Sequence, residues 1–443
     1  CRTFDSCPRR ATFRYVGLVR REDRWVGEVS GLVVDITPPF PVTLAANGDP
    51  MRKSISADGR LEANVVIFER PSSPILLVSF DLLYVGPLLR NLINQSLAED
   101  FDAANILLFA THTHSAPATD PTKPRLGKAD DRYVSWVVQQ VCGAVRRLLG
   151  SSRGSRANLE VTSGDAAMGV NRRKPVRISV SRRGFKFGLV GAGANPSGPR
   201  DDQITILTLR SEVSGQPLAI IWNYACHPVG HPGPGVLSAH FPGWVRQRIR
   251  SNVASEDLPV LFLQGFSGDI RPNSPSTNMP TTRGWWRAGG YSGFSDSDYE
   301  YWCSKLSDVV AGLVQKPGAR ATGATSSVHR IELPRANFVV GSEAAGPVEF
   351  ASLVLGNDVR IVGVSAEVVV AYSEIVRCAA KEQWALPSGC LGDVVGYVPT
   401  DRMLAEGGYE AGGFCPNFSC DAVAHGVQAS TVAGLQSVAA AQA

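Results

Sequence analysis

Short apolar runs that stop abruptly at polar residues recur along the chain and predict buried strands. The clearest of them covers 106–110 and ends directly before Thr111-His112-Thr113-His114. Another ends before Cys226-His227-Pro228, and a third ends before Ser365-Ala366-Glu367. We therefore expect the carboxyl ends of several strands to present histidine and glutamate side chains.

Helical periodicity alternates with these runs. Strands are predicted over 26–36, 61–68, 75–83, 159–180 (interrupted at Gly169), 204–209, 218–224, 260–263 and 359–364. Helices are predicted over 87–97, 133–149, 241–253, 299–314 and from Glu367 to about Glu382, with Ser365 as the N-cap. The alternation favours βαβ units, so we expect an α/β fold with a mixed, largely parallel sheet flanked by helices.

Two stretches rich in glycine, proline and polar residues, 185–199 and 274–300, predict long loops. The second contains Trp285-Trp286, which we interpret first as packing residues of a covering loop. Residues 1–25 are polar, basic and aperiodic, and we interpret them as an amino-terminal arm. Residues 26–443 then form one large domain.

Composition narrows the function classes. The 443 residues carry 44 Lys+Arg against 40 Asp+Glu, and a net charge of +4 is too small to indicate a nucleic-acid partner. No apolar run is long enough for a transmembrane segment. None of the nine cysteines forms a Cys-x-x-Cys motif, which argues against a structural zinc knuckle. The late cluster of Cys390, Cys415 and Cys420 predicts either a disulfide or, as we favour, buried thiols.

The strand endings suggest a metal site. Residues i and i+2 of a strand share a face, so His112 and His114 would point into one cavity. A lone His-x-His is more often satisfied by hydrogen bonds, but two histidines and a glutamate are a common ligand set for catalytic zinc. Asp81 lies within an apolar run, where it could orient a histidine or serve as a satisfied structural carboxylate.

Taken in order, the motifs resemble the neutral/alkaline (non-lysosomal) ceramidase family over about Val34 to Gly413. The residues that carry the resemblance are Ala110-Thr111-His112-Thr113-His114-Ser115, Asn171-Arg172, Cys226-His227-Pro228, Gln264 to Asn273, Glu367 after a strand, Gly396-Tyr397-Val398 and Tyr409-Glu410.

The resemblance implies a zinc-hydrolase core similar to that of aminopeptidases, with hydrolysis of the amide of N-acylsphingosine as the reaction. By its motifs the zinc ligands are His112, His227, Glu367 and Tyr397. The other active-site residues that it implies are His114, Arg172 and Tyr409, and Asp269 and Arg271 are candidate substrate contacts. A secreted or periplasmic location is also implied.

Two features depart from the family pattern. Arg271 stands where ceramidases carry a serine, and arginine favours a carboxylate or phosphate partner. The sequence also stops shortly after Gly413, so we expect no carboxy-terminal immunoglobulin-like domain. The leading hypothesis is a zinc amidohydrolase of a lipid or smaller N-acyl amide. The alternatives are a zinc hydrolase of a small polar amide or peptide-like metabolite, and an inactive binding protein on the same fold. The sequence does not indicate an oligomeric state.

Overall fold

The computed structural model describes residues 24–46, 49–70, 73–151, 154–180, 185–230, 233–273, 294–342 and 346–442, with the backbone alone for 177–180 and 185–189. Residues 1–23 lie outside this range, so an amino-terminal arm ending at residue 25 stays a prediction. Trp25 is buried, and its backbone N–H donates to Ala321 O at 2.7 Å. Within the described residues, no helix is long and apolar enough to cross a bilayer.

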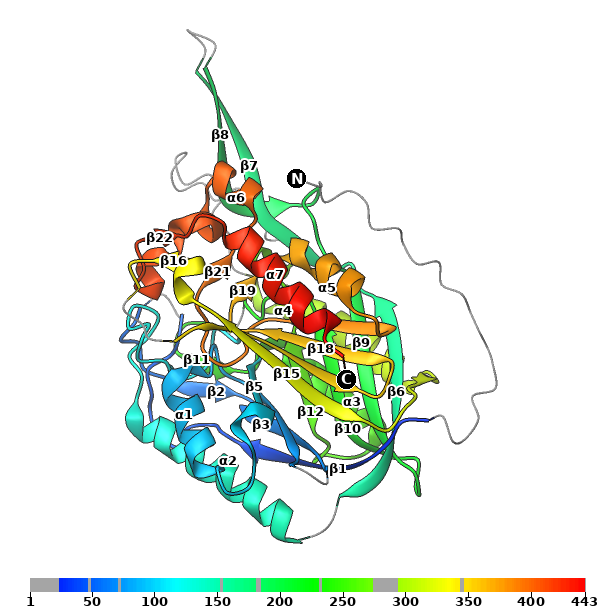
Figure 1. Ribbon diagram of the computed structural model, residues 1–443. Helices are drawn as coiled ribbons and strands as arrows, with labels where there is room; N and C mark the ends of the chain where they lie inside the picture. Colours follow the sequence, from blue (N-terminus) through cyan, green and yellow to red (C-terminus); the bar gives the residue numbers. More distant parts are fainter. Residues whose placement is uncertain are drawn as a thin grey trace.

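Among the residues described, the largest sheet has nine strands (Figure 1). In spatial order they are β12 (Val260–Gln264), β10 (Pro217–Tyr224), β9 (Gln203–Ser211), β6 (Ser155–Asp165), β1 (Val26–Asp35), β3 (Glu62–Phe68), β4 (Ile75–Phe80) and β5 (Ile106–Ala110), with β14 (Ala319–Arg320) beside β6.

This sheet is mixed, as expected, but the expectation that it is largely parallel is wrong. Only β4–β5 and β10–β12 pair in parallel, and the other neighbours are antiparallel. A parallel pair needs a long crossover, and α1 (Gly86–Ser96) and α3 (His240–Val253) supply one each. The chain leaves β5 just before His112 and leaves β10 just before His227. Each parallel pair therefore includes a strand that leads into a predicted ligand.

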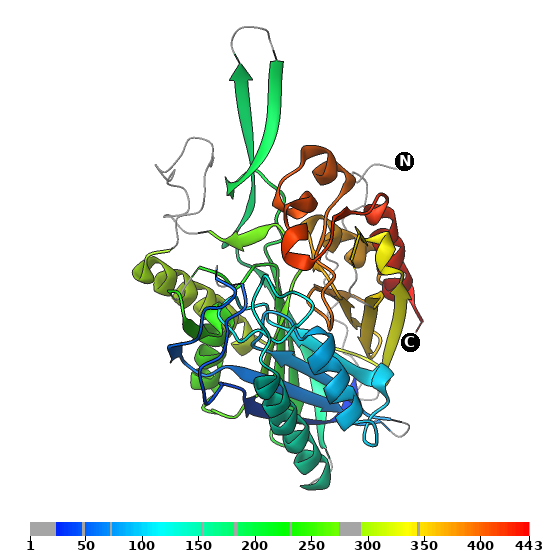
Figure 2. The ribbon, with the colours of Figure 1, turned by 90° about the vertical axis from the view of Figure 1, so that its left-hand side faces the viewer.

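Helices and a second sheet cover the two faces of the large sheet (Figures 1 and 2). On one face lie α1 and α3 together with α2 (Asp131–Ser151) and α4 (Asp296–Gln315). The second sheet consists of β15 (Ser326–Leu333), β17 (Val348–Leu355), β18 (Val359–Val364) and β20 (Trp384–Ser388), covered by α5 (Ser373–Ala379) and α7 (Val427–Ala440). Because both faces are covered, β3, β4 and β5 are buried along their whole length, which explains why their sequences are mostly apolar.

A long hairpin projects beyond these layers (Figure 2). It consists of β7 (Gly169–Val180) and β8 (Phe185–Asn195), with β13 (Ile270–Pro272) paired to the base of β7. The expected interruption of this run is confirmed, but the turn between β6 and β7 covers 166–168, and Gly169 is already the first residue of β7. The loop expected from residue 185 is wrong as far as Asn195, since antiparallel pairing with β7 satisfies the glycine-rich backbone.

The helix expected from Glu367 is also wrong at its start. Glu367–Val368 forms the short strand β19, which pairs in parallel with β21 (Tyr397–Val398), and α5 begins only at Ser373. The β-branched run Val368-Val369-Val370 suits an extended backbone, and pairing with β21 overrides the capping pattern. The remaining elements are β2 (Ser56–Asp58), β11 (Val236–Ser238), β16 (Val339–Val340), β22 (Ala422–Val423) and α6 (Asp401–Glu406). The four other predicted helices match α1 to α4.

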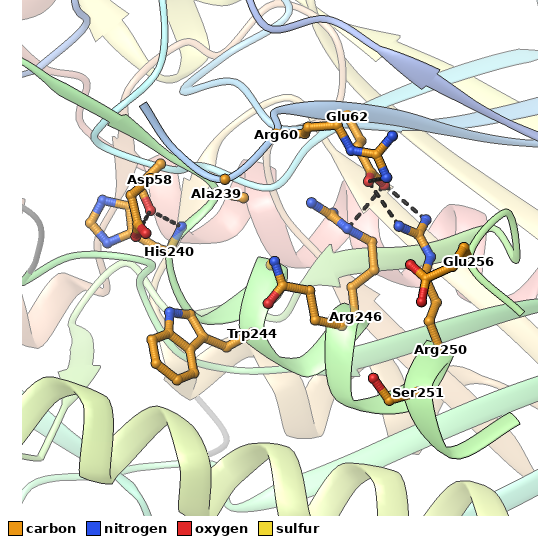
Figure 3. A pocket seen from close by; sticks show the side chains of 14 residues that line it. Asp58, Arg60, Glu62, Ala239, His240, Trp244, Arg246, Arg250, Ser251 and Glu256 are labelled. Atoms are coloured by element: carbon orange, nitrogen blue, oxygen red, sulfur yellow. Dashed lines mark hydrogen bonds and ion pairs between the residues drawn. The ribbon is translucent and has the colours of Figure 1, made fainter. Parts of the chain in front are cut away.

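A buried ionic network fixes α3 to β3 (Figure 3). Glu62 accepts hydrogen bonds from Arg250 Nη1 and Nη2 at 2.8 Å each and pairs with Arg246 Nε at 3.0 Å. Arg246 Nη2 also donates to Asp81 at 2.8 Å. Asp81 was expected either to orient a histidine or to be a structural carboxylate. The second alternative is confirmed, since its hydrogen-bond partners are Arg246 and the Glu62 backbone N–H. The network lines a polar cavity of about 370 Å³.

The late cysteines are buried thiols. Cys390, Cys415 and Cys420 are free in the structure, as the favoured interpretation predicts.

Candidate metal centre

His112 and His114 follow β5 and meet at their ring nitrogens. The two Nε2 atoms are 3.4 Å apart, and the ring centroids are 4.9 Å apart. The expected convergence is confirmed, although β5 ends at Ala110 and His112 is not part of a strand. His112 instead takes a left-handed backbone with φ 67°, and this turn directs its ring to the site.

His227 and Glu367 bring two further ligand atoms to the same place. Glu367 Oε2 lies 3.2 Å from His227 Nε2 and 3.3 Å from His112 Nε2. The chain reaches His227 from the end of β10 and Glu367 from the end of β18. All three side chains are almost fully buried, so the atoms face a small enclosed volume.

Backbone carbonyls orient both histidines. His112 Nδ1 donates to Leu83 O at 3.1 Å, and His227 Nδ1 donates to Ser267 O at 2.7 Å and Ile270 O at 3.0 Å. In a neutral imidazole these bonds place the proton on Nδ1 and leave the Nε2 lone pair directed at the shared point. Such anchoring of the distal nitrogen is characteristic of metal-binding histidines.

The spacing of these atoms suits a tetrahedral cation. For bonds of about 2.0–2.1 Å, two ligands of a tetrahedral ion are roughly 3.3–3.4 Å apart. The measured separations of 3.2, 3.3 and 3.4 Å lie at or close to that value. A direct Nε2···Nε2 contact of 3.4 Å is beyond a good hydrogen bond. The buried group of His112, His114 and His227, whose nitrogens lie within 4.8 Å of one another, is therefore compatible with a metal ion.

The electrostatics of the cluster favour a cation. Burial, and secondarily the neighbouring Arg172, lower the pKa of His227 to about 4. Burial and the other two histidines lower the pKa of His114 well below its ordinary value. Burial opposes a charge on His112, but Cys390 and Glu367 raise its pKa well above the usual range. Burial thus disfavours a charge on His227 and His114, and the neutral imidazole is the form that binds a divalent ion.

Tyr397, Arg172 and Glu410 form the wall beside the histidines. Arg172 Nη2 donates to Tyr397 Oη at 3.1 Å, and Arg172 Nε donates to Glu410 Oε1 at 2.8 Å. Tyr409 stacks edge-on against Tyr397 with centroids 5.4 Å apart, and its side chain is 40% exposed. The sequence-predicted residues are therefore brought together, with Tyr409 at the open side of the group.

Asp269 and Arg271 are buried behind this wall. Asp269 accepts hydrogen bonds from Asn171 Nδ2 at 2.7 Å and from the Val370 N–H at 2.8 Å. The Arg271 guanidinium lies 5.9 Å from the Phe294 ring. A direct contact of either side chain with substrate stays a prediction.

His240 is buried and is held by two hydroxyl groups. His240 Nε2 lies 3.0 Å from Ser115 Oγ, and His240 Nδ1 lies 3.2 Å from Tyr299 Oη. His231 and the Trp285-Trp286 pair fall outside the described residues. No second group of metal ligands is found in the part of the chain that the structure describes.

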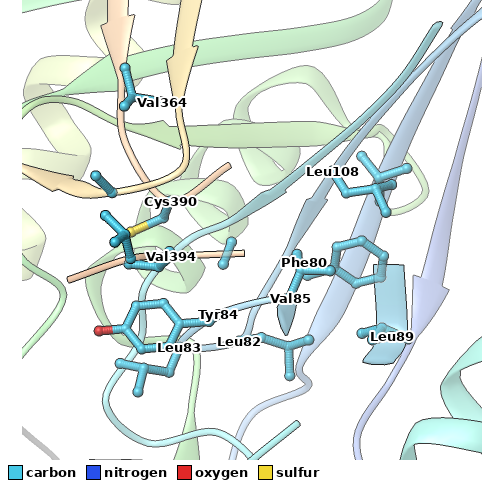
Figure 4. Packing of buried hydrophobic residues seen from close by; sticks show 14 of the residues in the cluster. Phe80, Leu82, Leu83, Tyr84, Val85, Leu89, Leu108, Val364, Cys390 and Val394 are labelled. Atoms are coloured by element: carbon cyan, nitrogen blue, oxygen red, sulfur yellow. The ribbon is translucent and has the colours of Figure 1, made fainter. Parts of the chain in front are cut away.

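Sequence reasoning missed Tyr84 and the role of Cys390. Tyr84 donates its hydroxyl hydrogen bond to Glu367 Oε1, and Cys390 contacts His112 from behind. Both belong to the buried apolar cluster, where Tyr84 lies beside Leu83 with its hydroxyl pointing away from Phe80 (Figure 4). In the sequence Tyr84 follows an apolar run, and that pattern does not distinguish it from an ordinary core aromatic.

Comparison with solved structures identifies the fold. A crystal structure of neutral ceramidase from Pseudomonas aeruginosa superposes with a TM-score of 0.71 at 14% identity, covering 94% of this chain and 74% of that one. A structure titled as ceramidase complexed with C2 gives a TM-score of 0.70 at 15% identity, covering 94% and 75%. The chain has the neutral ceramidase fold.

That ceramidase fold is recognisable from structure rather than from sequence similarity. No protein-family model and no curated protein sequence matches the chain. At 14–15% identity the structural superposition establishes the fold alone. At the level of the fold, it confirms the resemblance to ceramidases that the ordered motifs indicated. The expected likeness to aminopeptidases stays a prediction, since neither of these two structures is an aminopeptidase.

Proposed function

We propose that this protein is a zinc-dependent amidohydrolase that cleaves an N-acyl amide, ceramide-like or smaller. Two observations of different kinds support the proposal: the neutral ceramidase fold, and the convergence of three imidazoles and a carboxylate at the ends of separate strands. The observation that carries it is the convergence, because a fold alone hosts many functions.

His112, His227 and Glu367 would hold the zinc ion, with Tyr397 as the fourth protein ligand. His112 and His227 have the anchored Nδ1 atoms that ligation requires, and Glu367 Oε2 is the atom nearest to both. His114 Nε2 is close enough to His112 to serve as an alternative ligand. We assign His114 to catalysis because it is only partly buried and faces the open side of the cluster with Tyr409.

Bound zinc would polarise the scissile carbonyl and lower the pKa of water, which is the chemistry that amide hydrolysis needs. The residues of the chain supply the remaining functions. His114, whose Nε2 lies 3.4 Å from His112 Nε2, would accept a proton and pass it to the leaving amine. The Tyr409 hydroxyl, to which Asn417 Nδ2 donates at 3.4 Å, can donate to the developing oxyanion.

Arg172 would orient the substrate, and it also holds Tyr397 and Glu410 in place beside the histidines. Its guanidinium is fixed by Glu410 and Tyr397 beside the proposed ligands, so this cation would attract and orient a substrate oxygen without reorganising. Glu410 also pairs with Arg173 at 2.9 Å, which anchors the loop that carries Tyr409. Loss of one oxyanion donor typically costs about 3 kcal/mol of activation free energy, and the same order is expected for Tyr409.

A small acidic N-acyl amide is the second candidate substrate, and the observation that favours it is Arg271. This cation lies on β13 directly after Ile270, whose carbonyl anchors His227. An arginine close to the site favours an anionic group on the substrate.

The test compares wild type with His112→Ala on a fluorescent ceramide and on short N-acyl amino acids. We expect wild type with zinc to hydrolyse one of the two classes, and His112→Ala to lose at least about 1,000-fold in kcat/KM, because a ligand of the metal is missing. His425→Ala is the matched control, since His425 is exposed and is expected to retain full activity. Full activity of His112→Ala would refute the proposal. A wild type that binds zinc but hydrolyses neither class would favour the binding protein.

A further inference from the structure

Three consecutive residues after β4 contact two of the proposed metal ligands. Leu82 O accepts from the His112 backbone N–H at 2.9 Å, and Leu83 O accepts from His112 Nδ1 at 3.1 Å. Tyr84, the next residue, donates its phenolic hydrogen to Glu367 Oε1. One short segment therefore sets the orientation of a histidine ligand and of the carboxylate ligand.

The hydrogen bond from Tyr84 gives the two carboxylate oxygens of Glu367 different partners. Oε1 is engaged by the phenol, while Oε2 faces His112 at 3.3 Å and His227 at 3.2 Å. A carboxylate whose second oxygen is hydrogen-bonded presents only one oxygen to a cation. A carboxylate without that bond can rotate and bind through both oxygens, occupying a coordination position that a hydrolytic metal keeps open.

Tyr84 is itself held in place from three sides. Its carbonyl accepts from Thr119 Oγ1 at 2.7 Å, and its ring lies 6.0 Å from the Phe418 ring. The Lys123 ammonium is 5.6 Å from the Tyr84 ring centroid and pairs with Asp120 and, at 3.4 Å, with Asp393. Only 4% of Tyr84 is exposed, so water does not compete for the carboxylate.

We infer that Tyr84 is a positioning residue that restricts Glu367 to one-oxygen ligation and keeps the catalytic coordination position open. This inference rests on the proposed function, because it concerns the same metal centre. Hydrogen bonds to ligating carboxylates from outside the ligand shell typically contribute 10- to 100-fold in metal affinity or activity.

Tyr84→Phe removes only the hydroxyl and is the direct test. Zn²⁺ affinity is measured by competition with a chromophoric chelator, and coordination is followed by the visible absorption of the Co²⁺-loaded protein. We expect Zn²⁺ to bind about 10- to 100-fold more weakly and the Co²⁺ band to weaken as coordination number rises. Tyr133→Phe is the matched control, because Tyr133 is equally buried and donates to Ile36 O at 2.7 Å, outside the site. The control is expected to match wild type in both measurements.

An unchanged Kd together with an unchanged Co²⁺ spectrum in folded Tyr84→Phe would overturn the inference and leave the proposed function standing. A wild type that binds neither ion would overturn both. If Tyr84→Phe does not fold, Thr119→Val, which removes the hydroxyl that holds the Tyr84 carbonyl, takes its place. A weaker Zn²⁺ affinity is expected there too, and an unchanged one contradicts the inference.

Discussion

His112 is held in a backbone conformation that few residues other than glycine adopt. Its φ of 67° is sterically costly for a side chain with a Cβ, and such conformations persist where the surroundings over-determine them. Here the Leu82 and Leu83 carbonyls fix both the backbone and the ring. The residue type was predictable from the sequence, but the turn that directs it to the site was not.

Gly268 offers a residue-scale prediction about the glutamate ligand. A Cβ at this position would lie 2.9 Å from Glu367 O and 3.1 Å from Val368 O. Both are backbone atoms, so relieving the clash requires a shift of the main chain. Gly268→Ala is expected to lower the free energy of unfolding by about 1–3 kcal/mol and to reduce zinc content, because β19 must shift. Urea denaturation and metal analysis of the purified variant measure both.

Gly312→Ala in α4 is the control for that substitution. A Cβ there meets nothing within 4 Å, so alanine is expected to stabilise the helix by about 0.5–1 kcal/mol. Unchanged stability and metal content in Gly268→Ala would show that β19 is not constrained as described.

At the scale of elements, apolar runs and helical periodicity were enough to locate α1 to α4 and the strands of the large sheet other than β14, but they missed β15, β17 and β20 of the second sheet. Pairing direction was harder to predict, because an apolar run looks the same whether its neighbour is parallel or antiparallel. The start of the helix expected at Glu367 was mispredicted because β19 pairs with β21, which lies thirty residues later in the sequence. Such long-range pairing leaves no local pattern. β8 resembled a loop for a different reason: its sequence is rich in glycine, and only pairing with the neighbouring strand β7 makes it a strand.

The ionic contact between α3 and β3 makes an element-scale prediction on pH. Burial would raise the pKa of Glu62, but Arg246 and Arg250 more than offset it, so its folded pKa lies below the unfolded value. Its contribution to stability is therefore fully present above about pH 4.5 and is lost as pH falls through the folded pKa. We expect wild type to lose stability on acidification from pH 6 to pH 3.5 more steeply than Glu62→Gln.

Glu62→Gln should also cost about 3–5 kcal/mol at pH 7, because buried Arg250 loses its carboxylate and buried Arg246 retains only Asp81. Urea denaturation at several pH values checks both statements. Parallel stability-versus-pH curves for the two proteins would contradict the linkage.

At the scale of the whole molecule, the two sheets and their helices converge on one place. The large sheet supplies His112 after the end of β5 and His227 after the end of β10, and the strand β18 of the second sheet leads to Glu367. Tyr397 comes from the strand that pairs with Glu367. The centre is therefore assembled only when both sheets are packed against each other, which ties the site to the complete fold.

X-ray diffraction on crystals of the zinc-loaded protein, with anomalous data collected on both sides of the zinc absorption edge, tests this central claim most directly. We predict a single strong anomalous peak about 2.0–2.2 Å from His112 Nε2, His227 Nε2 and Glu367 Oε2. A well-ordered cluster of these side chains with no peak between them, or with zinc bound only elsewhere, would contradict the account.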